Sequence, residues 1–376
     1  MKKSLLILFI FFSVNLLTAC SDNNVNEPAN TSEGDLSFIK LPAGFNIEYY
    51  SDNVPGARSM VFAGEENILF IGTRGEGKVY ALLDTDGDMV ADEKYIVAEG
   101  LDSPNGVALR NGDLYVAEIN RVIKFPDIFS NYMGSPSFEI INNNFPSDKS
   151  HGWKYIAFGP DEKLYVPVGA PCNVCLNENE IYASITRMDP DGTNLEIYAE
   201  GIRNTVGFDW HPETNILWFT DNGRDWMGDN RPPDELNRAP EKGMHFGFPF
   251  CHGGDIEDPD FTGRNCNEFI PPVQKLGPHV AALGMKFYTG AMFPEEYKNQ
   301  IFIAEHGSWN RDEKIGYRVI IVRLSGTEAT SYEPFAEGWL QGESVSGRPV
   351  DVELLPDGSM LVSDDYAGAV YRIYYD

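Results

Sequence analysis

A hairpin pattern that recurs six times constrains this chain more than any other feature of its sequence. Each copy has an apolar run, a tight turn of Gly, Pro, Asp, Glu or Asn, and a second run with a pair of large apolar residues. A repeat of roughly fifty residues is typical of propeller blades, and a β-sandwich would not explain six copies of one hairpin. The copies are Ser59–Thr73, Gly106–Glu118, Lys154–Gly169, Val206–Asp221, Gly284–His306 and Val350–Asp364.

A further β-rich segment follows most copies of the hairpin, and helical periodicity is nearly absent. These observations predict an all-β protein, a six-bladed β-propeller, as one domain over residues 36–376. The additional segments are Lys78–Asp84, Arg121–Asp127, Ser184–Gly192, Arg318–Leu324 and Ala369–Tyr375.

The first twenty residues have the pattern of an export signal. Lys2 and Lys3 precede a short apolar run, and Leu17–Cys20 resembles a bacterial lipoprotein cleavage site. We expect lipidation at Cys20, a flexible tether over residues 21–35, and a domain anchored to a bacterial membrane on its periplasmic side or at the cell surface. An ordinary secretory signal with a chance cysteine is the alternative.

The formal net charge of −28 limits the partners that the chain can bind. Such an acidic protein is unsuited to nucleic acid and to long-range attraction of anions, whereas divalent cations suit it. A solvated acidic surface accounts for most of this charge without any function.

Four cysteines remain beyond the lipidated one. The pairs Cys172–Cys175 and Cys251–Cys266 close the shortest loops, so we expect these disulfides, although three pairings are possible. A zinc site is disfavoured by the unequal spacing and by export. A redox-active Cys-x-x-Cys lacks a βαβ context, and Leu176 stands where a c-type haem requires His.

Polar side chains concentrate where loops enter the first strand or leave the second strand of each copy. In a propeller, these loops open on one face. The rim therefore gathers arginines, histidines and carboxylates on an otherwise acidic protein, which predicts a functional site; solvated loops are the alternative for any single residue. The residues concerned are Arg58, Arg74, Asn105, Glu118, His151, 170–175, Arg203, Asn204, 221–235, His279, 306–311, Arg348, Asp364 and Asp365.

The chemistry of this rim favours an anion, a base and a metal. Arg203, Arg348 and Arg311 can pair with carboxylates, and His151 can act as a general base. Gly223, in a loop of Asp and Asn, can offer a carbonyl to Ca²⁺. Together these groups suggest a redox site.

Several motifs of this rim resemble a known family, the soluble glucose/sorbosone dehydrogenases. The resemblance covers nearly all of residues 36–376 and implies a six-bladed propeller that uses pyrroloquinoline quinone with Ca²⁺. The motifs most similar to the sorbosone branch are His151–Lys154, Cys172-x-x-Cys175 and His306–Arg311; those shared with the family are Gly201–Asn204, Asp221–Gly223, Asp234–Asn237 and His245–Pro249.

The resemblance implies a role for each matching residue. His151 would remove a proton from the substrate hydroxyl as hydride passes to the quinone. Arg203 and Asn204 would contact the quinone, and Arg203 would stabilise developing negative charge. Arg348 would bind a cofactor carboxylate, with Arg311 in place of the family's lysine.

The resemblance also implies a calcium site and a class of substrate. The backbone carbonyls of Gly223 and Arg224 would hold Ca²⁺, with Asp234 and Glu235 as acidic ligands. The substrate would be a sugar or a sorbosone-like sugar aldehyde, and the electron acceptor a cytochrome c or a quinone. Ser150 stands where the glucose enzymes have an acid, so we do not expect glucose.

Two other function classes remain open. A calcium-dependent lactonase-type propeller would use carboxylates and Ca²⁺ without quinone, and a non-catalytic propeller would bind a glycan or a protein. The paired arginines disfavour the hydrolase, which has no large anion to hold.

Other polar and aromatic residues are ambiguous. The acidic segment Asp84–Glu93 resembles a calcium loop or an acidic hairpin turn. We interpret His211 and His252 as structural and His245 and His279 as rim residues without a role. Trp153, Trp226 and Trp309 fall in rim loops, where they could stack on a sugar or the quinone or pack between blades.

Overall fold

The structure is a computed structural model that describes residues 27–30 and 34–376. The predicted signal peptide with its lipidated Cys20 and most of the predicted tether therefore lie outside the described residues. Among the residues described, no helix is both long enough and apolar enough to cross a bilayer.

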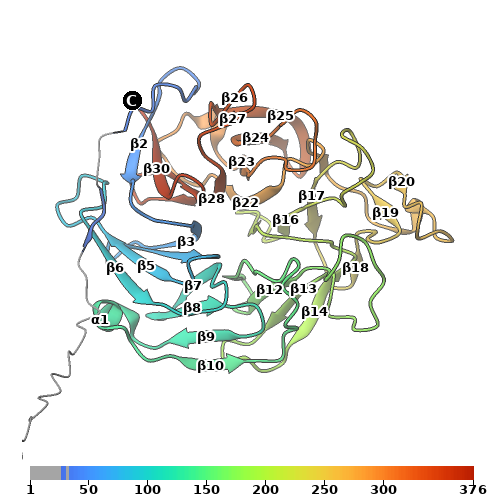
Figure 1. Cartoon of the computed structure of the whole chain (residues 1–376), viewed down its shortest axis with the longest axis horizontal. Helices are drawn as coiled ribbons and strands as arrows, with labels where there is room; N and C mark the ends of the chain where they lie inside the picture. Colours follow the sequence, from blue (N-terminus) through green and yellow to red (C-terminus); the bar gives the residue numbers. More distant parts are fainter. Residues whose placement is uncertain (1–26, 31–33) are drawn as a thin grey trace, which may run out of the picture.

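Six sheets surround a central axis as the blades of a β-propeller (Figure 1), which confirms the predicted fold. The first three blades contain β3 (Ala57–Ala63), β4 (Ile68–Thr73), β5 (Val79–Leu83) and β6 (Glu93–Ala98); β7 (Gly106–Arg110), β8 (Asp113–Ala117), β9 (Val122–Phe125) and β10 (Glu139–Asn142); and β11 (Ala157–Phe158), β12 (Leu164–Val168), β13 (Ser184–Met188) and β14 (Glu196–Glu200).

The other three blades follow the same antiparallel order. They contain β15 (Phe208–Trp210), β16 (Leu217–Asp221), β17 (Glu235–Ala239) and β21 (Gln274–Lys275); β22 (Ala282–Phe287), β23 (Ile301–Glu305), β24 (Arg318–Ser325) and β25 (Glu328–Glu337); and β28 (Pro349–Leu354), β29 (Met360–Asp364), β30 (Ala369–Tyr375) and β2 (Phe45–Ser51).

Short elements lie in the connections between these strands. They are α1 (Ile128–Asn131), η1 (Tyr132–Gly134), β18 (Met244–His245), β19 (Cys251–His252), β20 (Ile256–Glu257), η2 (Cys266–Glu268), η3 (Glu295–Tyr297), β26 (Leu340–Gln341) and β27 (Ser344–Val345). β18 pairs in parallel with β14 of the preceding blade, so the long insertion of the fourth blade is attached to two blades.

The outer edge of the first blade carries a fifth strand, β1 (Glu27–Pro28), paired with β6. These residues fall within the predicted tether, and in the structure they extend the sheet of the first blade. The exposed edge of β6 offers unpaired backbone groups to any neighbouring chain segment. Ala29 is buried there, and its carbonyl accepts a hydrogen bond from the Ser51 hydroxyl.

The ring closes where β2, near the start of the propeller, pairs with β30, at the end of the chain (Figure 1). β2 thereby supplies the outer strand of the sixth blade. Phe45 at its beginning meets four aromatic rings edge-on, with centroid distances of 4.7–5.1 Å, from Phe293, Tyr297, Phe335 and Tyr375. The closure is thus held by backbone pairing and by an aromatic cluster that joins the fifth and sixth blades.

The acidic segment Asp84–Glu93 connects β5 to β6. Carboxylate oxygens of Asp84, Asp86 and Asp88 lie within 4.8 Å of one another. Asp84 is buried and accepts hydrogen bonds from the backbone N–H groups of Gly87 and Met89 at 2.7 and 2.9 Å. This geometry suits a tight acidic turn, and calcium binding there stays a prediction.

Replacement of Phe45 by Ala tests whether the closure stabilises the ring. We expect Phe45→Ala to lower the free energy of unfolding by about 3–5 kcal/mol, the usual cost of removing a buried ring. The matched control is Phe138→Ala, because that ring is 39% exposed. Chemical denaturation of both variants measures the difference; equal losses would contradict a special role for the closure.

Candidate functional site

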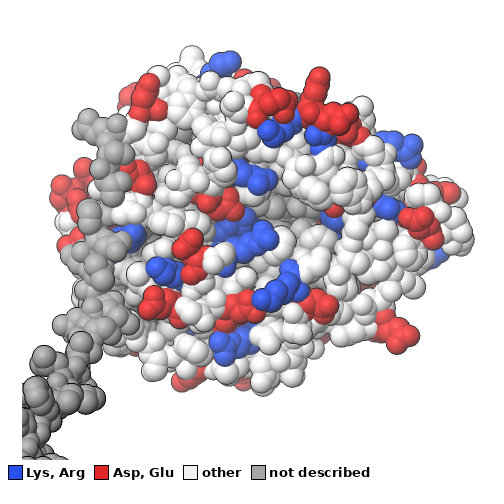
Figure 2. Space-filling view, in the orientation of Figure 1, with Lys and Arg blue, Asp and Glu red and all other residues white. Residues whose placement is uncertain are grey.

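A cavity of about 320 Å³ opens at the rim where the loops of the blades converge. Figure 2 shows Lys and Arg side chains bordering the hollow at the centre of this face. The first, third, fourth, fifth and sixth blades and their loops supply the lining: Arg58, Arg74, His151, Trp153, Arg203, Asn204, Asn222, Gly223, Asp225, Asp234, His279, Ala281, Leu283, His306, Gly307, Trp309, Asn310 and Arg348.

Many of the predicted rim residues line this cavity, whereas several others lie behind or beside it. Asn105 is buried and accepts a hydrogen bond from Nε of Arg58 at 2.8 Å, so it supports the lining from behind. Glu118 accepts hydrogen bonds from the Asp102 backbone and from Arg121, and it takes no part in the cavity.

Three guanidinium groups face one part of the cavity, and only one of them forms an ion pair with a carboxylate among the described residues. Arg58 pairs with Asp365 at 2.9 Å. Arg348 donates to the carbonyls of His306 and Gly307, both at 3.0 Å, and Arg74 lies 3.9 Å above the Trp153 ring. Within the described residues neither the Arg74 nor the Arg348 guanidinium forms an ion pair with a carboxylate, so this part of the cavity carries excess positive charge.

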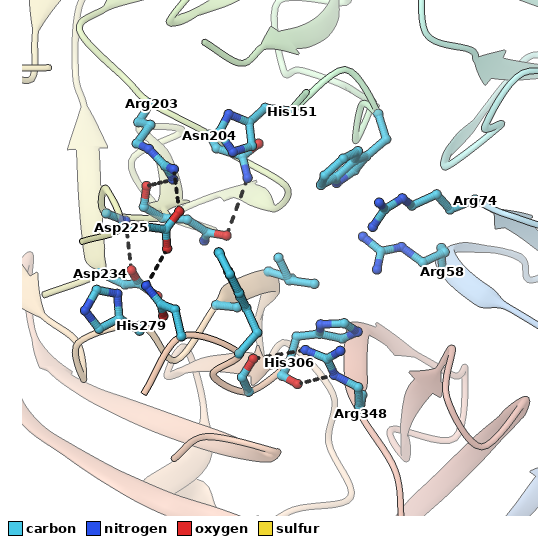
Figure 3. Close-up of a pocket in the computed structure, with 18 residues that line it drawn as sticks. Arg58, Arg74, His151, Arg203, Asn204, Asp225, Asp234, His279, His306 and Arg348 are labelled. Atoms are coloured by element: carbon cyan, nitrogen blue, oxygen red, sulfur yellow. Dashed lines mark hydrogen bonds and ion pairs between the residues drawn. The ribbon is translucent and has the colours of Figure 1, made fainter. Parts of the chain in front are cut away.

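The pKa of Arg74 reflects this crowding. Burial lowers it most, the nearby charges of Arg58 and Arg348 lower it further, and the charge of Asp365 opposes them. Arg58 and Arg74 extend side by side from one side of the cavity (Figure 3). An anion placed among these groups would relieve their mutual repulsion.

His151 is held as a neutral imidazole. Its Nδ1 lies 2.8 Å from the carbonyl oxygen of Ala170, so Nδ1 carries the proton and Nε2 keeps its lone pair. Burial, and then the charge of Arg203, lowers its pKa to about 4. Gly169 permits the close approach, since a Cβ there would lie 2.6 Å from Cβ of His151.

The segment around His151 is anchored from behind by a buried amine. His151 has a left-handed backbone, with φ 50°, which is uncommon for a residue with a side chain. Nζ of Lys154 donates to the carbonyls of Gly152 and Ile119, both at 2.7 Å, and burial lowers the pKa of this amine to about 7. The two carbonyls and the amine fix the turn that presents the imidazole.

Arg203 and Asn204 are positioned by hydrogen bonds to the end of a neighbouring strand, β16. The carboxylate of Asp221, at the end of β16, accepts hydrogen bonds from both backbone N–H groups, at 2.9 and 2.7 Å. The Arg203 guanidinium is buried and donates to Asn173, the Asn222 carbonyl and Asp225. Arg203 therefore contributes a fixed positive charge, with most of its donors already satisfied.

Asp225 is a site residue to which sequence reasoning gave no role. It lies 3.2 Å from the Arg203 guanidinium and accepts a hydrogen bond from Nδ2 of Asn310 at 2.8 Å. It thus connects the rim loops of the fourth and fifth blades. Its place in the loop after β16 was the available signal, but its partners come from distant segments.

Buried carboxylates occupy the side of the cavity opposite Arg58 and Arg74 (Figure 3). Asp234 lines the cavity and accepts the N–H of Gly223 at 2.8 Å; burial raises its pKa to about 7. Burial, together with Glu235, raises the pKa of Asp221 to about 8. A cation bound here would favour the ionised forms of these buried carboxyl groups.

The predicted metal ligands do not all reach the cavity. Gly223 and Asp234 line it. Glu235 instead accepts hydrogen bonds from Asn237 and the Gly253 backbone, and the Arg224 guanidinium pairs with Asp258 at 2.6 Å. For Arg224 only the backbone is left as a possible ligand.

Arg311 lies outside the lining, which corrects its predicted place at the channel mouth. Its guanidinium donates to the carbonyls of Glu313 and Asp229, because these loop carbonyls lie within its reach. Arg311 thereby fastens one rim loop to another.

The other histidines divide into three groups. His279 and His306 line the cavity, and Nε2 of His306 lies 2.8 Å from Asp365. Nδ1 of His245 accepts the Gly247 N–H, and this side chain lines a neighbouring pocket. The structural interpretation of His211 and His252 is confirmed: the former accepts a turn N–H, and the latter bonds with Asp258 at 2.8 Å.

Both predicted disulfides are present. Cys172–Cys175 lies in the rim loop whose Asn173 contacts Arg203, and Cys251–Cys266 ties the insertion of the fourth blade. The first disulfide therefore constrains a loop that holds a site residue.

Comparisons with known proteins identify relatives over most of the chain. A family model described as a domain of unknown function, DUF7133, matches residues 48–372. An uncharacterized protein of Borreliella burgdorferi is 33% identical over 369 residues, which cover 92% of this chain and 93% of that protein.

Two relatives with named activities match smaller parts. Aldose sugar dehydrogenase YliI of Escherichia coli is 27% identical over 187 residues, covering 48% of this chain and 44% of that protein. The pyrroloquinoline quinone-dependent pyranose dehydrogenase of Coprinopsis cinerea is 30% identical over 134 residues, covering 30% of this chain and 18% of that protein.

Solved structures share the fold. A calcium structure of a Trichoderma reesei enzyme of carbohydrate-active family AA12 has a TM-score of 0.80 at 18% identity, covering 92% of this chain and all of that chain. The holo form of the pyranose dehydrogenase PQQ domain from Coprinopsis cinerea has a TM-score of 0.72 at 17% identity, covering 92% and 98%.

The protonation state of His151 can be measured directly. We expect its ring nitrogens to report a neutral Nδ1–H tautomer at pH 6–7 and to become doubly protonated only near pH 4, because burial and Arg203 oppose the cation. Nitrogen-15 NMR of ring-labelled protein, assigned with a His151→Gln variant, measures this. Titration near the ordinary value of about 6.5 would contradict the site's electrostatics.

Proposed function

The chain belongs to the DUF7133 family. We propose that it is an oxidoreductase that oxidises a sugar or sugar aldehyde with pyrroloquinoline quinone as its cofactor. The observation that carries the proposal is the cavity with three guanidinium groups and one carboxylate partner. The names of the Escherichia coli and Coprinopsis cinerea relatives support it.

The residues present fit this cofactor. Pyrroloquinoline quinone is a flat polycarboxylate, and the positive charges of Arg58, Arg74 and Arg348 in the lining could pair with its carboxylates. Trp153 offers an aromatic surface beside Arg74, and its indole Nε1–H is buried without a partner among the described residues. A flat anion would balance the excess positive charge of the arginines and could accept a hydrogen bond from this indole N–H.

Calcium is proposed on the opposite side of the cavity. The Asp234 carboxylate and the Gly223 backbone would hold the ion, with the Arg224 carbonyl as a further ligand. Asp234 is buried and forms no ion pair among the residues described, which is costly unless a cation is near. Glu235 does not line the cavity, so it would favour the ion only through its negative charge and not as a ligand.

His151 is proposed as the general base and is therefore the catalytic residue. When bound, the quinone supplies a two-electron acceptor that takes hydride from the carbon of an alcohol or hydrated aldehyde. The lone pair of Nε2 takes the hydroxyl proton, while the Ala170 carbonyl holds the tautomer. The fixed charge of Arg203 stabilises negative charge that develops nearby, and Asn204 orients groups beside it.

The cellular setting is part of the same proposal. We infer an exported, lipid-anchored protein whose electrons pass to a cytochrome c or a membrane quinone, and a sorbosone-like sugar aldehyde as substrate. The support comes from the motif at Leu17–Cys20 and from the two disulfides, which suit an oxidising compartment. A lactonase or a non-catalytic propeller would leave the arginine cluster without a role.

Cofactor binding tests the arginine cluster. We expect Arg348→Gln and Arg74→Gln each to weaken binding of pyrroloquinoline quinone about 10–100-fold, since each removes a charge-assisted hydrogen bond. Arg264→Gln is the matched control because this arginine pairs with Glu268 on the insertion. Calorimetry with Ca²⁺ present measures the affinities. No binding to the intact, folded protein would overturn the proposal.

Activity tests the base. We expect His151→Gln to lower kcat by about 10²–10⁴-fold, the usual contribution of a general base, while cofactor affinity stays within a few-fold. His245→Gln is the control, because that histidine lines a different pocket. Dye-linked assays of the cofactor-loaded protein with a panel of sugars and sugar aldehydes supply kcat. An unchanged kcat in His151→Gln would assign the base elsewhere.

A further inference from the structure

Two tryptophans project from the rim at the mouth of the cavity. Trp226 is 68% exposed and Trp309 is 64% exposed, and Trp309 also lines the cavity. Their rings meet edge to face, with centroids 5.4 Å apart and planes at 88°. The pair therefore presents an open aromatic corner to solvent that is continuous with the site.

The loops that carry the pair are fastened to each other directly beneath it. Asp225, the residue before Trp226, accepts a hydrogen bond from Asn310, the residue after Trp309, at 2.8 Å. Asp225 is in turn paired with Arg203 of the cavity. The base of the aromatic corner is thus connected to the site by two successive polar contacts.

Further hydrogen bonds connect these two loops to each other and to the cavity lining. The Arg311 guanidinium donates to the Asp229 carbonyl, and the Asp312 N–H donates to the Asp229 carboxylate at 3.3 Å. His279 of the lining bonds with the Gly228 carbonyl at 3.0 Å. These contacts preorganise the loops, which lowers the entropic cost of binding a ligand on them.

The backbone of Trp226 adds an independent observation. Its φ is 69°, a left-handed conformation that is a genuine outlier for a bulky residue. Backbone strain of this kind persists where the surroundings enforce it, and it clusters at functional sites. Here the enforced conformation keeps a large apolar ring in water instead of burying it.

We propose that the corner formed by Trp226 and Trp309 is a subsite for a second sugar ring, so that the preferred substrates are oligosaccharides or glycosides whose terminal ring enters the cavity. This inference rests on the proposed function for the identity of that terminal ring. It concerns the substrate class, and it assigns Trp226 and Trp309 as specificity-determining residues.

The chemistry of the corner favours a saccharide. The C–H face of a pyranose ring is apolar and packs on an aromatic ring, while its hydroxyls need polar partners. Carboxylates and amides lie close to the pair, and the buried Oδ1 of Asn310 has no partner among the described residues. A cavity of about 320 Å³ is at the small end of ligand sites, so a cofactor and more than one sugar ring would extend past its mouth.

Equilibrium binding to the cofactor-free protein tests the subsite separately from catalysis. The probes are neutral mono-, di- and trisaccharides in several linkage series, titrated by tryptophan fluorescence and calorimetry. We expect at least one series to bind more tightly with length, and Trp226→Ala to raise the trisaccharide Kd about tenfold while leaving the monosaccharide Kd unchanged. Trp309→Ala should raise the trisaccharide Kd by a larger factor than the monosaccharide Kd, because Trp309 also lines the cavity.

The matched control is Tyr366→Ala, an aromatic residue of another blade that is 62% exposed; it should retain the length dependence. The absence of any gain with length in every series, or identical binding by the tryptophan variants, would overturn the subsite and would leave the pair as a contact for a protein electron acceptor. Length-dependent binding without sugar oxidation by the cofactor-loaded protein would instead support the subsite and reject the dehydrogenase.

Discussion

The hydrogen-bonded pairing of β2 with β30 is the constraint on which the site depends, because it turns six separate sheets into a closed ring. A propeller blade has an unpaired outer edge and contacts its neighbours through side chains, so an open ring could splay. Once the ring is closed, each rim loop has a fixed place around the axis. The arginines from the first and sixth blades, Arg58, Arg74 and Arg348, can then face the carboxylate of Asp234 from the fourth.

The resulting cavity has two poles of opposite charge. Guanidinium groups with too few carboxylates lie on one side, and buried carboxylates with raised pKa values lie on the other. Both arrangements cost free energy, because charges are removed from water without full compensation. His151 lies between these poles as a neutral base, and the same burial that strains the charges keeps it unprotonated. A ligand that brings an anion and a cation together relieves both poles.

The repeat of the hairpin was enough to predict the fold and the face on which the site lies. In a propeller, the loops that enter the first strand and leave the second strand of each blade open on the same face. It also placed His151, Arg203 and Arg348 at the cavity. Partner choice could not be predicted, because it depends on distances of a few ångströms between segments far apart in sequence. Arg311 binds a loop carbonyl, the Arg224 side chain pairs with Asp258, and these outcomes follow from local reach within packed loops.

In the function that we propose, the arginine pole recognises the carboxylates of a flat quinone. The most direct test compares, with Ca²⁺ in the buffer, the affinity of the intact protein for pyrroloquinoline quinone with its affinity for the neutral trimethyl ester, in which the ring is kept and the carboxylates are masked. We expect the ester to bind at least about 100-fold more weakly, because charge-assisted hydrogen bonds to guanidinium are lost. Equal affinities for the acid and the ester would contradict it.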